Sequence, residues 1–243
     1  MRILVTNDDG INSPSLHKLA VWAKHRLGEV VVCAPKVEQS GKSQAIDIIN
    51  TVEVKRVDFE EEIEAYAVDS TPADCVRFGI VGLKYGFDLV ISGINRGYNM
   101  GKDIIYSGTV GAIFEAYGLG VKAVAFSTDF TSFDTAVANL DRVYDYIEDN
   151  KLFDLCDLYN VNIPTEIKGD ILITRQGKAC YSDEFVLVDA EKHLYKQRGE
   201  FIPECCNSLE YDTNAIKCGY ISICPMTTER CDVAVFKKLT ETK

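Results

Sequence analysis

An alternation of short apolar runs with amphipathic segments over about the first 165 residues most constrains the fold. The apolar runs have the length and composition of buried strands and lie at residues 3–5, 30–34, 89–91, 121–126 and 159–163. Between them, apolar residues recur at helical spacing in segments placed at 13–27, 72–83, from 107, and 133–149. This alternation predicts an α/β fold with a doubly wound, mainly parallel sheet.

Hairpin patterns occur in two places. Residues 52–58 and 64–68 predict a small β excursion, and short segments at 171–174, 185–188, 193–197 and 220–224 precede a short terminal helix. Because such hairpins cannot close a core alone, we expect one domain spanning residues 1–243. Its core is placed at about 1–165, and a β-hairpin extension with a C-terminal arm at about 166–243.

The charge balance bears on the class of partner. The chain has 26 Lys and Arg against 37 Asp and Glu, a net charge of −11, and no basic run. This charge repels phosphate backbones and anionic lipids, so we expect no polymeric nucleic acid partner and no membrane partner. The longest uncharged stretch, residues 104–114, is well short of the roughly 20 residues of a membrane span.

The cysteines and the first residues indicate a cytoplasmic location. Asp8 and Asp9 follow a short strand-like run, which leaves no apolar signal core. The nine cysteines are scattered, without a CxxC pair, and are expected to be reduced thiols. The group from Cys205 to Cys231 is disfavoured as a soft-metal site because it lacks paired spacing and a nearby His.

Polar residues follow the first predicted strand. Asn7-Asp8-Asp9-Gly10 lies where that strand ends, and ligands of open α/β sheets bind at the carboxyl ends of strands. The two carboxylates can meet one ion only if the backbone turns sharply, which Gly10 permits. The alternative is an Asx turn that only caps the strand.

Two later segments offer further ligands. Residues 93–101 follow another apolar strand and contain three glycines and Asn95, although a connector without a ligand has the same composition. Residues 106–111 begin a helix with hydroxyls and small residues, whose free N–H groups suit an anion, or else form an ordinary cap. Together these carboxylate, amide and hydroxyl groups favour Mg²⁺ or Mn²⁺ beside a phosphate, and thus phosphoryl transfer.

Three other motifs fail on spacing or context. Gly41-Lys42-Ser43 ends like a P-loop, but Lys36 stands where the first glycine is required. The glycines at 118 and 120 leave a helix, whereas a dinucleotide fingerprint must open one. The three histidines, at 17, 25 and 193, form no metal-spaced pair.

Five ordered blocks of the chain resemble the SurE-type (survival protein) family of metal-dependent 5′/3′-nucleotidases. The blocks are 3–10 (ILVTNDDG), 34–41 (Ala-Pro followed by Gln-Ser-Gly), 71–76 (TPADCV), 88–97 (DLVISGINRG) and 105–112 (IYSGTVGA). Weaker similarity extends to about residue 225. The resemblance implies a Rossmann-like core, with a β extension and C-terminal segment that are often exchanged between subunits of a dimer or tetramer.

The resemblance also implies the chemistry and its residues. A cytoplasmic phosphatase would release phosphate from nucleoside 5′- and 3′-monophosphates, with short polyphosphate as a further substrate. One divalent ion per subunit, Mg²⁺ or Mn²⁺, would be held by Asp8, Asp9, Ser40 and Asn95. Asp8 or Asp9 would orient or deprotonate the attacking water. The residues expected around the phosphate are Asn7, Gly41, Ser107, Gly108 and Thr109.

The chain departs from the family pattern at positions that are not proposed ligands. Ser15 and Ser70 replace usual glycines, Asp47 replaces a common threonine, and residues 224–226 replace Thr-Pro-Leu. Asp47 would add negative charge near a phosphate site. Two other functions remain open: an aspartyl-phosphate-forming phosphatase, whose Asp-x-Asp pattern the first strand lacks, and a nucleotide sensor without turnover.

Overall fold

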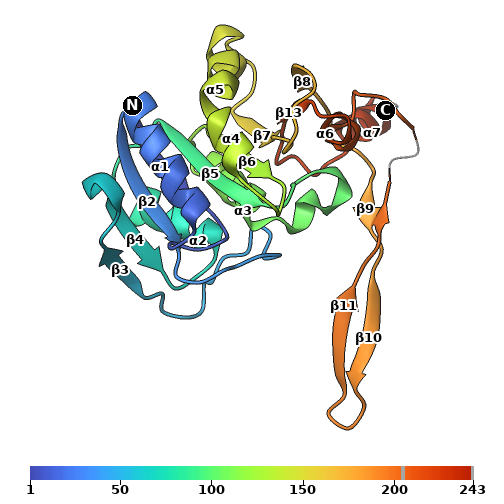
Figure 1. Ribbon diagram of the computed structural model, residues 1–243, viewed down its shortest axis with the longest axis horizontal. Coiled ribbons are helices and arrows are strands. Elements are labelled where there is room, and N and C mark those ends of the chain that lie inside the picture. Colours follow the sequence, from blue (N-terminus) through green and yellow to red (C-terminus); the bar gives the residue numbers. More distant parts are fainter. Residues whose placement is uncertain (204–205, 242–243) are drawn as a thin grey trace.

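The computed structural model describes residues 1–203 and 206–241, and a nine-stranded sheet forms its centre (Figure 1). Six strands run parallel: β4 (Glu64–Val68), β2 (Glu29–Pro35), β1 (Arg2–Thr6), β5 (Leu89–Arg96), β6 (Ala123–Thr128) and β7 (Leu158–Asn162), in that spatial order. Antiparallel β3 (Val54–Val57) closes one edge. At the other edge, β13 (Ile221–Pro225) pairs antiparallel with β7, and β8 (Ile171–Ile173) pairs parallel with β13.

The strand order reverses direction between β1 and β5. From β1 the chain builds outward through β2 and β4, then returns to place β5, β6 and β7 on the other side. β1 and β5 pair directly, with Thr6 opposite Ser92. Ligands of open α/β sheets bind at such a reversal, beyond the carboxyl ends of the two strands. The fold therefore places the residues after Thr6 beside those at the end of β5.

Helices cover both faces of the sheet, as a doubly wound fold requires. One face packs against α1 (Pro14–Arg26), α4 (Asp134–Ala138) and α5 (Leu140–Asp149), and the other against α2 (Pro72–Arg77) and α3 (Gly108–Gly118). β1 serves both cores, because Ile3 and Val5 face the first set of helices and Leu4 faces the second. Proline at the first position of α1 and α2 fits the expected helix starts.

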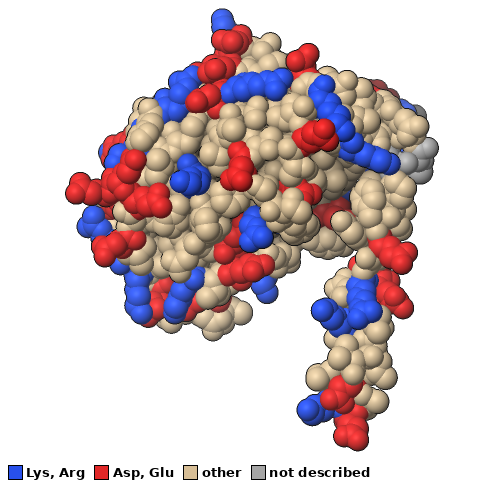
Figure 2. All heavy atoms as spheres, viewed as in Figure 1, with Lys and Arg blue, Asp and Glu red and all other residues tan. Residues whose placement is uncertain are grey.

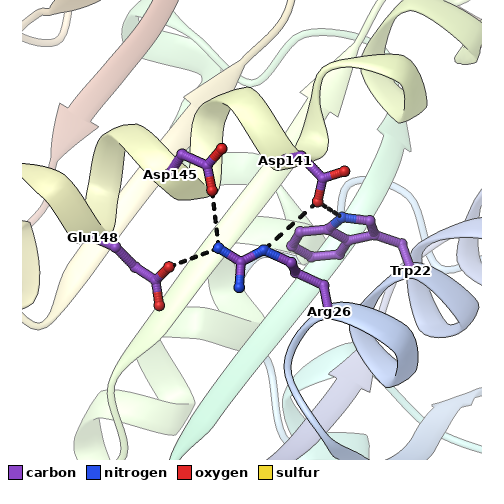
Figure 3. Close-up of polar contacts among 5 residues, drawn as sticks. All are labelled: Trp22, Arg26, Asp141, Asp145 and Glu148. Atoms are coloured by element: carbon purple, nitrogen blue, oxygen red, sulfur yellow. Dashed lines mark hydrogen bonds and ion pairs between the residues drawn. The ribbon is translucent and has the colours of Figure 1, made fainter.

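A polar cluster joins α1 to α5 on the outer side of one helix layer (Figure 3). The Arg26 guanidinium lies 2.9 Å from Asp145 and 2.8 Å from Glu148, and the Trp22 indole N–H donates to Asp141 at 2.8 Å. These side chains are largely exposed, so each ion pair contributes little. The cluster adds polar contacts between two helices whose relative position is set by the apolar core that they share.

An arm projects from the C-terminal part of the fold (Figure 1). β9 (Cys180–Tyr181) pairs with β12 (Phe201–Ile202) at its base, and β10 (Glu184–Asp189) pairs with β11 (Leu194–Arg198) towards its tip. α6 (Asp212–Lys217) packs beside β13, and α7 (Val233–Thr240) follows. On the face drawn in Figure 2, positive and negative side chains are interspersed over the core and along the arm.

Four short helical turns complete the described structure. They are η1 (Glu60–Glu62), η2 (Phe78–Gly82), η3 (Gly101–Tyr106) and η4 (Leu152–Asp154). η2 is a π turn that continues α2, and η3 leads directly into α3. Within residues 1–203 and 206–241, no helix combines the length and apolar character that a transmembrane span requires.

The predicted α/β class with a mainly parallel sheet is confirmed. Three details differ. β5 continues through Gly93 to Arg96, the segment at 133–149 divides into α4 and α5 at Asn139, and the predicted hairpin at 171–174 is instead β8, a strand of the main sheet. The sheet therefore does not end near residue 165, since β13 and β8 extend it. The short helix α6 had no counterpart in the sequence reading.

Candidate active site

The loop after β1 makes a tight turn that presents two carboxylates. Gly10 has a φ of +99°, a conformation that side chains rarely adopt, as expected for the turn residue. The Asn7 amide donates to the Gly10 carbonyl at 3.1 Å and accepts from the Gly10 N–H at 3.2 Å. Asn7 therefore closes the turn, as the capping alternative supposed, but its bonds reach three residues along the chain, whereas an Asx turn spans two. The turn that Asn7 closes forms the frame that holds Asp8 and Asp9 beyond the strand end.

Asp8 is buried against the N-terminus of α3. The Thr109 hydroxyl donates to Asp8 Oδ1 at 2.5 Å. A Cβ atom at Gly108 would lie 3.0 Å from Asp8 Cβ and 3.2 Å from Oδ2, so a side chain there would require Asp8 to shift by a few tenths of an ångström. Burial raises the pKa of Asp8, while hydrogen bonds from the side chain and backbone of Thr109 oppose the shift. The sequence block at 107–109 thus reaches the block at 7–10 directly.

Asp9 has a half-buried carboxylate in less favourable surroundings. Its Oδ2 is buried and has no hydrogen-bond partner among the described residues. Burial, followed by the charge of Asp8, raises the pKa of Asp9 to about 6, with the backbone N–H of Arg96 acting in the opposite direction. A buried carboxylate oxygen without a partner is costly unless a cation binds it. This atom is the observation that most directly favours a metal site.

The loop after β2 brings Ser40 and Gly41 towards the carboxylates. The Gln39 N–H donates to the Asp8 carbonyl at 2.8 Å, which ties this loop to the turn after β1. Ser40 is exposed and donates to Glu38 Oε1 at 2.8 Å. Gly41 has a φ of +73°, with open space where a side chain would stand. Ser40 and Gly41 therefore lie on a loop whose preceding residue, Gln39, is hydrogen-bonded to the backbone of Asp8.

Two hydrogen bonds attach the next residues of this loop to α3 and to the turn before α3. The Ser43 N–H donates to the Tyr106 carbonyl at 3.0 Å, and the Gln44 amide donates to Glu115 at 2.9 Å. Glu115 is buried and also pairs with Arg77 at 2.6 Å. These residues hold the Ser40 loop in place before any ligand binds.

Asn95 lies at the carboxyl end of β5, beside β1. Its amide nitrogen donates to the Gly97 carbonyl at 2.7 Å, so the amide oxygen is the atom that a metal ion would bind. Ser15, at the start of α1, donates to the Ile94 carbonyl at 2.7 Å. This departure from the family pattern thus anchors the strand end that carries Asn95.

The remaining phosphate candidates play framing roles in this structure. The Ser107 hydroxyl accepts from the Val110 N–H at 3.1 Å and caps α3, as the ordinary-cap alternative supposed. Thr109 points to Asp8, and Asn7 closes its own turn. In the first turn of α3, the Thr109 backbone is bonded to Asp8 and the Val110 N–H to Ser107, which leaves the Gly108 N–H as the donor suited to a phosphate.

Three residues of this region were absent from the sequence reading. Glu38 contributes a negative charge that raises the pKa values of Asp8 and Asp9, and Gln44 and Glu115 anchor the Ser40 loop. An acidic residue two positions before Ser40 was the available signal for Glu38. Glu115 gave none, because one acidic residue on an amphipathic helix is usually exposed.

Two departures from the family pattern form one small network. The Ser70 hydroxyl donates to Asp74 at 2.5 Å, and the same carboxylate oxygen accepts from the Asp47 N–H at 2.8 Å. The Asp47 carboxylate accepts bonds from the backbone N–H groups of Ile49 and Asn50, which lowers its pKa. The negative charge of Asp47 is therefore stabilised by hydrogen bonds within its own loop.

The residue types that these three loops carry fit a divalent ion. Carboxylate, hydroxyl and amide oxygens are the donors that Mg²⁺ and Mn²⁺ prefer, and Asp9 supplies an unpartnered oxygen. By contrast, the described residues contain no cluster of three or more His, Cys, Asp or Glu side chains placed for a metal. This includes the described C-terminal cysteines, while Cys205 lies outside the described residues.

The comparison with known families decides the affiliation. The model of the family described as Survival protein SurE matches residues 3–183. This chain belongs to the SurE family. The 5'-nucleotidase SurE of Caldanaerobacter subterraneus subsp. tengcongensis is 37% identical over 254 aligned residues, covering 99% of this chain and 97% of the relative. The 5'-nucleotidase SurE of Thermoanaerobacter sp. (strain X514) is 38% identical over 237 residues, 93% and 92% of the two chains.

A solved SurE structure shares the whole fold. The SurE protein from Aquifex aeolicus superposes with a TM-score of 0.79 at 31% sequence identity. The match covers 100% of this chain and 99% of the other, so it includes the arm and the C-terminal elements. The family resemblance and the Rossmann-like fold expected from the sequence are both confirmed.

Proposed function

We propose that this SurE protein is a metal-dependent phosphomonoesterase that hydrolyses nucleoside 5′-monophosphates to nucleoside and phosphate. The relatives named 5'-nucleotidase SurE, aligned over nearly the full chain, support the activity and substrate class. The observation that carries metal dependence is the buried, unpartnered Asp9 Oδ2 beside Asp8 at the strand-order reversal.

The proposed metal ligands are Asp8, Asp9, Ser40 and Asn95, with one Mg²⁺ or Mn²⁺ per subunit. When bound, the ion supplies Lewis acidity, polarising a phosphoryl oxygen and lowering the pKa of water. Thr109 fixes one oxygen of Asp8 through its hydroxyl, and the Gln39 N–H fixes the backbone of Asp8. The donor set is therefore largely preorganised.

The chain's own groups position the substrate and handle the proton. The Gly108 N–H at the start of α3 holds a phosphate oxygen, with Gly41 allowing close backbone approach. Asp9 is better placed than Asp8 to take a proton from the attacking water, because Thr109 already occupies Asp8. Attack of that water on phosphorus forms a new P–O bond and breaks the P–O bond to the nucleoside, whose oxygen accepts a proton from solvent while Asp9 returns its proton to solvent.

The finer specificity follows from what the site contacts. The Gly108 N–H and the divalent ion that the four ligands would hold contact only the phosphate group, which 5′- and 3′-nucleotides both present as a monoester dianion. We therefore include 3′-monophosphates as substrates. Short polyphosphate is a phosphoanhydride, but its terminal phosphate offers the same oxygens, and we include it as a further substrate. The net charge of −11 disfavours polymeric nucleic acid. The eight cysteines that the structure describes are free thiols, which supports a cytoplasmic location.

Exposed apolar side chains support assembly into a homodimer or homotetramer. Phe185 and Tyr195 on the arm are 68% and 58% exposed, and Phe236 and Leu239 on α7 are 57% and 69% exposed. Apolar surface of this extent usually marks a contact with another chain. We propose that the arm and α7 pack against a second copy.

The direct test is phosphate release from a panel of purine and pyrimidine 5′- and 3′-monophosphates and tripolyphosphate, each with EDTA, Mg²⁺ or Mn²⁺. Release that requires metal and is suppressed by EDTA is the expected result. Binding of monophosphates without release would favour the nucleotide sensor instead. Trapping of a phosphoenzyme would favour the aspartyl-phosphate mechanism.

A further inference from the structure

An aromatic-walled cavity of about 230 Å³ lies between the loops after β5 and β6 and the base of the arm. Its walls come from three places: Tyr98 after β5, Phe130 after β6, and Tyr181 with Phe201 at the base of the arm. The Tyr181 and Phe201 rings pack edge to face, with centroids 5.6 Å apart. Pockets for whole drug-sized ligands begin at roughly 300 Å³, so this volume suits one part of a nucleotide.

The cavity shares a loop with the proposed metal ligand Asn95. The Phe130 ring lies directly on Gly97, where an added Cβ would come within 2.7 Å of the ring. The Gly97 carbonyl in turn accepts the Asn95 amide at 2.7 Å, and Arg96 donates to the Phe130 carbonyl at 3.2 Å. A substrate with its phosphate at Asp8 and Asp9 therefore has this cavity one short loop away.

The arm side of the cavity is fixed to the core. The Lys102 N–H donates to the Ala179 carbonyl at 2.8 Å, and the Tyr181 N–H donates to Asp103 Oδ2 at 2.6 Å. These bonds hold the base of the arm on η3, so the Tyr181 wall keeps its position relative to Phe130. The walls of the cavity are therefore in place before a flat ligand binds.

The negative charges that line the cavity favour the base of a nucleotide over its phosphate. Asp103 and Asp129 both line the cavity, and no Lys or Arg among the described residues does so. Two carboxylates repel a phosphate but tolerate an uncharged ring. Aromatic side chains bind nucleobases by stacking, with little dependence on sequence.

We propose that the cavity between Tyr98, Phe130, Tyr181 and Phe201 is a slot that stacks the nucleobase of the substrate, with Phe130 as its main stacking residue. This inference rests on the proposed nucleotidase function and names the part of the protein that would hold the base.

The first experiment measures binding of adenosine, which lacks a phosphate, in EDTA by NMR titration. Phe130→Ala should weaken binding about tenfold, within the range for losing one stacked base, while Phe130→Tyr stays within about twofold of wild type. Phe185→Ala is the matched control, because Phe185 is equally exposed on the arm and lies outside the cavity. No binding by wild type, or equal binding by Phe130→Ala, would overturn the slot.

The second experiment separates a base contact from a loop effect. The ratio of kcat/KM for adenosine 5′-monophosphate to that for ribose 5-phosphate should fall about tenfold in Phe130→Ala. An unchanged ratio, with both substrates affected alike, would overturn the proposal in favour of a structural role for Phe130. A wild-type protein that releases no phosphate would refute the proposed function. The adenosine titration would still test whether the cavity binds a nucleobase.

Discussion

Asp8 and Asp9 are neighbours in the chain, but their surroundings differ. Asp8 accepts hydrogen bonds from the hydroxyl and backbone of Thr109, whereas Asp9 leaves a buried oxygen unpartnered among the described residues. The difference gives the two carboxylates separate roles: Asp8 is held in a fixed orientation, and Asp9 keeps one oxygen available for a cation. The sequence alone offered no basis for dividing these roles.

At the residue scale, Asp9→Asn should stabilise the metal-free protein at pH 7.5 by about 1–2 kcal/mol, a figure discounted for partial exposure. The folded-state pKa of Asp9, about 6, lies above the ordinary 3.8, so the penalty for its charge is complete above pH 6 and absent below 3.8. Thermal unfolding in EDTA should show the gain at pH 7.5 and none near pH 3.5. A variant less stable than wild type at pH 7.5 would contradict this electrostatic picture.

Thr109→Val should lower metal affinity or kcat about 10- to 100-fold, because it removes the hydroxyl that orients Asp8 while keeping a similar shape. Thr109→Ser restores the hydroxyl and should recover most of the loss. Calorimetric titration with Mn²⁺, beside turnover, distinguishes orientation of Asp8 from a direct phosphate contact, which would change the KM for substrate and leave Mn²⁺ affinity intact.

At the element scale, local sequence patterns predicted most helices and strands, but they could not predict which distant strands pair. Pro14 marked the start of α1 because proline suits the first helical position. The partner of β8 could not be predicted, since Ile171 pairs with Ile221, far along the chain. The carboxyl-edge rule predicted that residues 7–10 lie beside the end of β5, where the backbone of Arg96 bonds to Asp9, whereas the Thr109–Asp8 contact needed the helix placement.

Asp212, at the start of α6, joins this helix to η3 and to the loop between β8 and β9, and should be sensitive to substitution. It is fully buried and accepts the N–H groups of Gly101, Gly177 and Thr213. An amide in its place would turn a donor towards at least one of these donors. Asp212→Asn should therefore lower the free energy of unfolding by about 2–4 kcal/mol in chemical denaturation.

The matched control for that experiment is Asp170→Asn, because the Asp170 side chain is 97% exposed and its contact with Arg142 is loose at 3.5 Å. Its stability should stay within about 0.5 kcal/mol of wild type. Equal effects of the two substitutions would show that Asp212 is not the junction inferred from its hydrogen bonds.

At the scale of the whole molecule, the arm is the part whose stability is not explained by packing in the core. β10 and β11 stand away from the sheet and expose apolar side chains on both strands (Figure 1). A two-stranded ribbon is marginal in water without a partner surface. The composition gave no sign of this, because the exposed apolar residues are few against the whole chain.

Replacing residues 184–198 by a short glycine turn should reduce the assembled protein to a smaller species while leaving the core folded. The β9–β12 pair would still close the loop, since it lies at the base of the arm. Light scattering after size-exclusion chromatography gives the mass, and far-UV circular dichroism checks the core. An unchanged mass would place the contact elsewhere, with α7 as the next candidate.

The central claim is that Asp8, Asp9, Ser40 and Asn95 form one metal site that drives hydrolysis of nucleoside monophosphates. The most direct measurement compares wild type with Asp8→Asn for Mn²⁺ binding and for phosphate release from adenosine 5′-monophosphate. The expected result is loss of both in a variant whose circular dichroism is unchanged. An Asp8→Asn protein that binds Mn²⁺ and releases phosphate at the wild-type rate would contradict the account.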